Sequence, residues 1–315
     1  MFEYIDGASR RITDVENFGQ KDEALYGLAD KIADAFDKNF ALRSIDQALN
    51  KIPGKSSDYI LGKIRNFESV TKLDPISTLL NLTQRGNILG ATNLKSFFKG
   101  LYSVYTKEGK AFAMKAGVTS KSAINKAMQA TTGETTGGLT QRYFNMIRFT
   151  QVEEGNRIAS ANAGRFFAED IFKSLLKKKN PVSKQILDDL GVDISTALKS
   201  GKLSDRDLSN AARTVTGDMN FYSNTLDLPL SFTSGEGAKV ITQFKAAAFQ
   251  QGVFAKKVVK EAIKKGRIMN LIYFLAFSQA SGEILADARA KASDRERPTG
   301  WMRVLDNYAY GPGWG

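Results

Sequence analysis

Apolar side chains recur three or four positions apart over long stretches of this 315-residue chain, and only six prolines interrupt them. Such spacing gathers apolar residues on one face of an α-helix, whereas a strand would show alternation. Long helices are expected at Leu139–Lys178, Ala238–Lys265 and Arg267–Lys291, and Ser204-x-x-Asp207 resembles a capping box that begins a shorter helix. We predict an all-α fold, an elongated multi-helix assembly with two or three long helices and short connecting helices.

The clearest internal boundary is the glycine- and threonine-rich stretch at residues 131–138. It predicts a flexible linker between an N-terminal helical region, 1–130, and a C-terminal region with the long helices, 139–292. Residues 293–315 contain two prolines and four glycines, which indicates an extended tail.

The sequence contains no histidine and no cysteine. It therefore lacks the commonest general base, a thiolate nucleophile and the ligands of zinc–thiolate and iron–sulfur sites. The adjacent carboxylates Glu153-Glu154, Glu169-Asp170 and Asp188-Asp189 point about 100° apart on a helix, so they do not converge on one site. Ser69-Val-Thr-Lys72 lacks the partner motifs of a serine–lysine enzyme, and Gly133–Gly138 lacks the ending of a phosphate-binding loop. We predict a protein that is not an enzyme, with no catalytic residues, metal site or cofactor.

The chain is basic, with 45 Lys plus Arg against 33 Asp plus Glu and a net charge of +12. Such a balance indicates an anionic partner, namely nucleic acid, acidic lipid or an acidic protein face, although lysines also serve solubility alone. The strongest local bias lies between Lys239 and Lys265, where Glu261 is the one acid and phenylalanines supply an apolar stripe. This pattern predicts a basic amphipathic helix that contacts the phosphates of nucleic acid or phospholipid. The contacts are assigned to Lys239, Lys245, Lys256, Lys257, Lys260, Lys264, Lys265 and Arg267.

The next segment, Ile268–Ala286, is the most apolar of the chain. Its length is near the roughly 20 residues that span a bilayer, but Asn270, Gln279 and Glu283 oppose a stable spanning helix. A buried core helix is the favoured interpretation, and a helix that is soluble in one assembly and inserted in a membrane in another fits the same pattern. The apolar packing or membrane residues are Ile268, Leu271, Ile272, Phe274, Leu275 and Phe277.

Several weak motifs follow one another in a defined order. Leu73–Gln84 has Asp-Pro followed by Asn-Leu-Thr-Gln, and Val152–Arg157 has glutamates followed by an arginine. Further along come Asn220-Phe221-Tyr222, Pro229, Gly237, Gln243-Phe244-Lys245 and the apolar helix at Ile268–Phe277. In this order, over roughly Leu73 to Tyr308, the chain resembles the large polyvalent and internal virion proteins of tailed phages.

The resemblance implies a helical virion component that is packaged or ejected with DNA and contacts DNA or the envelope during genome delivery. Its expected partners are portal, core or tail proteins, DNA, the host membrane and further copies of the same chain. Its expected place is the capsid interior or tail, then the host cell or envelope after ejection. Two alternatives stay open: a helical nucleic-acid-binding protein of the infected cell, and a structural adaptor with protein partners only.

Overall fold

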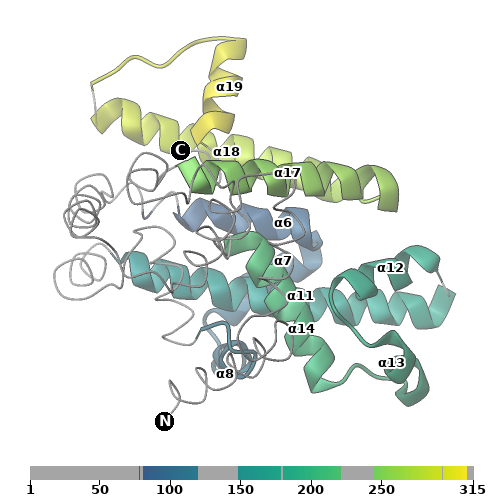
Figure 1. The fold of residues 1–315 in the computed structure, drawn as a ribbon. Coiled ribbons are helices and arrows are strands. Elements are labelled where there is room, and N and C mark those ends of the chain that lie inside the picture. Colours follow the sequence, from purple (N-terminus) through teal and green to yellow (C-terminus); the bar gives the residue numbers. More distant parts are fainter. Residues whose placement is uncertain are drawn as a thin grey trace, which may run out of the picture. The chain divides into compact units, whose positions relative to one another are not determined.

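The computed structural model describes residue 78 and residues 81–119, 148–178, 180–220, 245–292 and 294–310. These residues are 83% helical and contain no strand, so the predicted all-α fold is confirmed. All of them belong to one compact unit, whose helices are shown in Figure 1. In chain order they are η1 (Gln84–Gly86), α6 (Asn87–Ala91), α7 (Leu94–Ser103), α8 (Lys107–Lys115), α11 (Phe149–Lys178), α12 (Pro181–Asp189), α13 (Ile194–Ser200), α14 (Asp205–Asn220), α17 (Lys245–Lys265), α18 (Ile268–Ala292) and α19 (Trp301–Tyr310).

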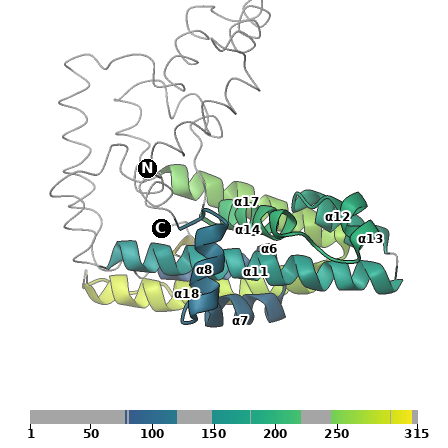
Figure 2. The ribbon, with the colours of Figure 1, turned by 90° about the horizontal axis from the view of Figure 1, so that it is seen from below.

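The longest of these helices, α11, forms the centre of the unit and packs against α7, α8, α12 and α14 (Figure 2). Its middle is buried on all sides because small residues let neighbouring helices approach closely. Gly100 of α7 lies against the backbone of Ala159 and the side chain of Ala163, and Gly164 of α11 lies against the backbone of Ala211. A side chain at either glycine would collide with the facing helix, so these contacts require glycine.

Two charged side chains lie inside this packed region. Arg157 is fully buried, and its Nε donates to Glu153 Oε1 at 2.7 Å. Its Nη1 donates to the carbonyl of Val118 at 3.2 Å, which secures the segment that follows α8. Asn81 Nδ2 donates to the other oxygen of Glu153 at 3.3 Å. The pair therefore links α11 to two segments that lie far away in the sequence.

The predicted capping box begins α14. The Asp207 N–H donates to Ser204 Oγ at 3.2 Å, and the Ser204 N–H donates to Asp207 Oδ2 at 2.9 Å. Asp207 also accepts from the Asp193 N–H at 2.9 Å, and Asp193 in turn caps α13. Hydrogen bonds from Ser195 and Thr196 lower the pKa of Asp193 to about 2. The two helix starts are thereby tied together.

The α17 and α18 helices are joined by a tight turn and lie next to each other (Figure 1). Gly266 has a φ of 66°, a left-handed conformation that glycine adopts easily and that ends α17. The expected long helix at Ala238–Lys265 is present from Lys245 onward, and residues 238–244 lie outside the described part. Likewise, α11 covers the expected helix at Leu139–Lys178 from Phe149 onward.

The α17–α18 pair rests on the short segment of η1 and α6. Gly86 faces the ring of Phe277 of α18, and Gly90 faces Phe254 of α17, so the two glycines make room for aromatic rings. Between them Asn87 exchanges two hydrogen bonds of 3.1 Å with Gln251 of α17. Both amides are fully buried, so this polar contact fixes the register of α17 on α6.

The extended tail predicted for residues 293–315 is wrong for residues 301–310, which form α19. The physical reason is a set of partners on α18: Arg297 donates to Asp287 at 2.7 Å, and Arg303 pairs with Glu283. These ion pairs hold a segment whose prolines and glycines alone indicated no helix. Residues 311–315 lie outside the described part.

The predicted linker at 131–138 also lies outside the described residues. Helices from both sides of it, α7 and α8 before and α11 after, pack within the same unit. The described helices of the predicted regions 1–130 and 139–292 therefore share hydrophobic packing, for example where Ile88 and Phe97 cluster with Ala159 and Ala163.

Candidate functional site

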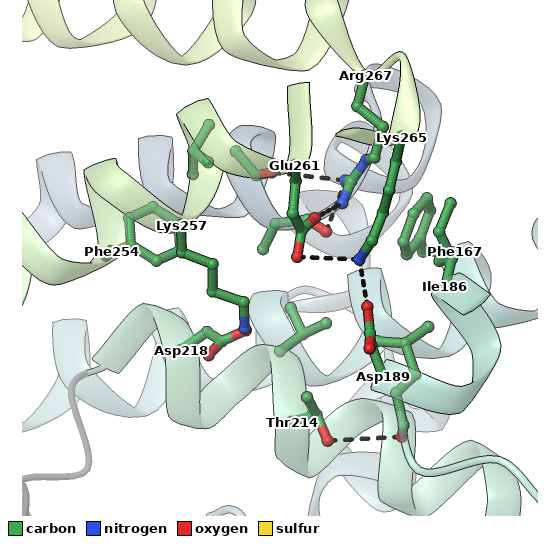
Figure 3. A pocket seen from close by; sticks show the side chains of 15 residues that line it. Phe167, Ile186, Asp189, Thr214, Asp218, Phe254, Lys257, Glu261, Lys265 and Arg267 are labelled. Carbon is green, nitrogen blue, oxygen red and sulfur yellow. Dashed lines mark hydrogen bonds and ion pairs between the residues drawn. The ribbon is translucent and has the colours of Figure 1, made fainter. Parts of the chain in front are cut away.

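Charged side chains gather where α17 meets α6, α12 and α14 (Figure 3). They come from four places in the sequence and lie around one small hollow. We call them the charged seam: Asp189 of α12, Asp218 of α14, Lys257, Glu261 and Lys265 of α17, and Arg267 of the turn before α18.

Arg267 is the most connected member of the charged seam. Its Nη2 donates to the carbonyls of Ala91 at 2.8 Å and Thr92 at 2.7 Å, and its Nη1 pairs with the carboxylate of Glu261. Its guanidinium carbon lies 4.9 Å from the centre of the Phe167 ring. The last carbonyls of a helix lack partners within that helix, so Arg267 caps the end of α6. Burial lowers the pKa of Arg267, and the Glu261 carboxylate opposes that shift.

The two seam lysines are bound by carboxylates. Lys265 pairs with Asp189 and lies 3.4 Å from Glu261, and its side chain is only 7% exposed. Lys257 Nζ lies 2.5 Å from Asp218 Oδ2. Burial raises the pKa of Asp218, and the attraction of Lys257 offsets part of that effect. Lys265 and Arg267 thus have their charges engaged inside the protein, which corrects the prediction that they face a phosphate partner.

The hollow bordered by the charged seam is small. Its cavity volume is ≈ 30 Å³, which leaves room for about two water molecules. The carboxylates around it are neutralised by lysine and arginine, and among the described residues no three acids come together to hold a metal ion. The charged seam therefore joins α12, α14, α17 and the turn before α18 through ion pairs.

Other predicted phosphate contacts do face solvent. Lys256, Lys260 and Lys264 are exposed and lie four residues apart along α17, which places them in one row on the helix surface. Within the part of the chain that the structure describes, none of the three pairs with a carboxylate. We call them the lysine row. Lys239 lies outside the described residues, and Lys245 is the first residue of α17, with no described side-chain surroundings.

The apolar helix α18 is not a core helix. By length and composition it is the one helix among the described residues that could span a membrane, yet only 28% of its apolar window is buried. Phe274 packs against Phe254 with ring centres 5.7 Å apart, and Leu271 and Phe277 are half-buried. The other predicted packing or membrane residues, Ile268, Ile272 and Leu275, are exposed. The favoured interpretation of a buried helix thus holds for one side of α18 only.

The α19 helix turns its polar side toward α18. Asn307 is buried and donates to Glu283, while Arg303 and Asp306 join the ion pairs around Arg297. Hydrogen bonds from Arg303 and Asn307 lower the pKa of Glu283 to about 2. The apolar side of α19 faces solvent instead, with Trp301, Met302, Val304 and Leu305 exposed. This apolar face could not be predicted from the sequence, because the prolines and glycines of residues 293–315 indicated an extended tail.

Comparisons with protein-family models, curated proteins and solved structures returned no match.

Proposed function

We propose that this chain is a non-enzymatic internal virion or DNA-ejection protein of a tailed phage. It packs as a helical component of the particle, in the capsid interior or tail, and contacts DNA or the envelope during genome delivery. After ejection it acts in the host cell or at the envelope. Its partners are portal, core or tail proteins, DNA and further copies of itself. The phage setting rests on the ordered motifs from Leu73 to Tyr308.

The observation that carries the binding part of the proposal is the lysine row. Three exposed ammonium groups on one side of α17 can each approach a phosphate, and no acid among the described residues pairs with them. The neighbouring lysines Lys257 and Lys265 are engaged by Asp218 and Asp189. The helix therefore uses one side for the protein interior and presents a second side to an anionic partner.

The exposed apolar side of α19 favours a second candidate, a structural subunit with protein partners only. Trp301 is 70% exposed and stands beside three further exposed apolar side chains of the same helix. Contiguous exposed apolar groups mark surfaces that associate. This candidate needs no DNA, so DNA binding separates it from the main proposal and from a nucleic-acid-binding protein of the infected cell.

Mass spectrometry of purified virions tests the phage setting. We expect peptides of this chain at a constant ratio to the portal protein after nuclease treatment and gradient purification. Peptides found in the infected-cell lysate but absent from the particle would contradict the proposal and favour the intracellular DNA-binding alternative.

Binding to duplex DNA is expected to weaken steeply with salt, and the lysine row is expected to carry part of that dependence. In the variant Lys256→Glu, Lys260→Glu, Lys264→Glu, the slope of log affinity against log salt should become shallower by about 0.9 for each phosphate that is no longer neutralised. Fluorescence anisotropy with a labelled duplex at several salt concentrations measures the slope.

The matched control changes net charge equally without touching the lysine row. Lys110→Glu, Lys184→Glu, Lys199→Glu replaces exposed lysines of α8, α12 and α13. It should reduce affinity through net charge alone and keep more of the original slope. Equal slopes for the two variants would contradict a specific contact at the lysine row.

A further inference from the structure

The surface around the α17–α18 turn is apolar. Ile263, Ile268, Met269 and Ile272 expose 77%, 59%, 53% and 49% of their area, and we call these four residues the corner. Ile268, Met269 and Ile272 lie within one or two turns of each other on α18, so they share one side of that helix. Gly266 reverses the chain between α17 and α18 and keeps Ile263 within a few residues of them. Adjacent exposed apolar groups of this kind indicate a binding surface.

The lysine row borders the corner. Ile263 lies three residues after Lys260 and next to Lys264, so these side chains lie on neighbouring parts of the α17 surface. Between residues 245 and 275 Glu261 is the only acid, and Lys265 and Arg267 both engage it. The corner is therefore an apolar surface next to positive charge. Neither the last turns of α17 nor the first turns of α18 carry a carboxylate without a basic partner.

Asn270, one of the three polar residues that oppose a spanning helix, is turned away from this surface. Asn270 donates its side-chain N–H to the carbonyl of Thr92 at the end of α6, so its amide has a partner inside the protein. It is half-buried, while Met269 before it and Ile272 after it are exposed. The outward side of the first turns of α18 is therefore apolar.

We propose that the corner binds the surface of a lipid bilayer that contains anionic headgroups. The four apolar side chains enter the boundary between headgroups and acyl chains, and the lysine row contacts the headgroup phosphates. This inference rests on the envelope contact of the proposed function and names the lipid chemistry and the residues that meet it.

A lipid bilayer matches both parts of this surface, the lysine row and the corner, better than DNA does. Duplex DNA supplies phosphates for the lysine row but presents mainly a charged backbone, which leaves the corner in water. An anionic bilayer supplies phosphates and an apolar layer directly beneath them. The exposure of α18 agrees with this choice, because a helix long and apolar enough to span a membrane is only 28% buried over its apolar window.

Vesicle flotation with the full chain tests the proposal. We expect the chain to float with vesicles of phosphatidylcholine mixed with phosphatidylglycerol, and to float much less with phosphatidylcholine alone. The variant Ile263→Ser, Met269→Ser, Ile272→Ser should lower partitioning into the anionic vesicles by about a hundredfold, because three exposed apolar side chains no longer gain by leaving water.

The matched control replaces equally exposed apolar residues elsewhere: Met114→Ser, Leu176→Ser, Leu198→Ser. It should float like the unmodified chain.

A second variant, Lys256→Gln, Lys260→Gln, Lys264→Gln, should remove the preference for anionic over neutral vesicles. Trp301→Ser, Met302→Ser, Leu305→Ser should leave flotation unchanged, and loss of flotation in this α19 variant alone would place the contact elsewhere and overturn the proposal.

A second readout does not depend on the folding of a triple variant. The chain has no cysteine, so Ile263→Cys carries a single polarity-sensitive dye at the corner, and Met114→Cys carries the same dye at a control position. Anionic vesicles should shift the emission of the dye at residue 263 to shorter wavelength and leave the dye at residue 114 unchanged. The same response at both positions, or none at 263, would overturn the proposal.

The lipid inference and the proposed function fail in different ways. Duplex DNA binding without vesicle binding would refute the corner as a lipid site and leave the DNA contact in place. Vesicle binding by a chain that is absent from virions would support the corner and refute the phage particle component.

Discussion

Replacing Glu153 with leucine is expected to lower the free energy of unfolding by about 3–5 kcal/mol, since it leaves a buried guanidinium without its carboxylate. Arg157 is fully buried and binds Glu153 Oε1 at 2.7 Å, so water cannot solvate the charge that remains. Asn81 also loses its acceptor on Glu153. Urea unfolding followed by circular dichroism measures the change.

A control variant and a double variant test whether the loss of stability comes from the Glu153–Arg157 pair. Glu154→Leu replaces the next residue of α11, which is exposed, and should change stability by less than about 0.5 kcal/mol. The double variant Glu153→Leu, Arg157→Met removes both charges and should recover most of the loss, because no unpaired charge stays buried. Equal stability of the two single variants would show that the Glu153–Arg157 pair does not stabilise α11.

Replacing Arg267 with methionine is expected to cost about 3 kcal/mol and to loosen the α17–α18 pair from α6. The methionine keeps much of the side-chain volume but takes a donor from the carbonyl of Ala91. It also removes one of two side-chain donors to the Thr92 carbonyl and one of two basic partners of Glu261, leaving Asn270 and Lys265. Hydrogen exchange should therefore accelerate at α6 and α17 more than at α12 and α13. The melting temperature reports the overall loss.

Arg267→Lys should recover little, because an ammonium group cannot reach one carboxylate and two carbonyls at once with the geometry of a planar fork. Arg295→Met is the control, since Arg295 is exposed, and it should leave both exchange and melting temperature unchanged within error. Uniform acceleration across all helices would contradict a local role for Arg267.

Arg157 and Arg267 both work inside the protein, although the basic composition alone suggests that arginines serve a partner. The net charge of +12 therefore overstates the charge available for binding at α17. The lysine row is the part of that helix free to meet phosphate.

Helix periodicity located the three long helices α11, α17 and α18. Ser204 and Asp207 begin α14 as predicted, because a capping box needs only residues three positions apart. The interior of α11 could not be predicted in the same way. Asn156, Arg157, Ser160 and Asn162 are polar residues of types that usually face solvent, yet all four are buried. Their partners, such as Val118 and Asn81, come from distant parts of the chain.

The sequence by itself determined the all-α class, the positions of the long helices and a basic helix followed by an apolar one. These features depend on spacing within one helix, which local periodicity records. Tertiary structure alone decided which charges are free. Lys256 and Lys257 are neighbours in the sequence, but about 100° of helical rotation separates them, and only the second meets Asp218. The same rotation puts Phe274 in the core and leaves Ile272 in solvent, because the packing of α17 and α6 covers one side of α18 and leaves the other open.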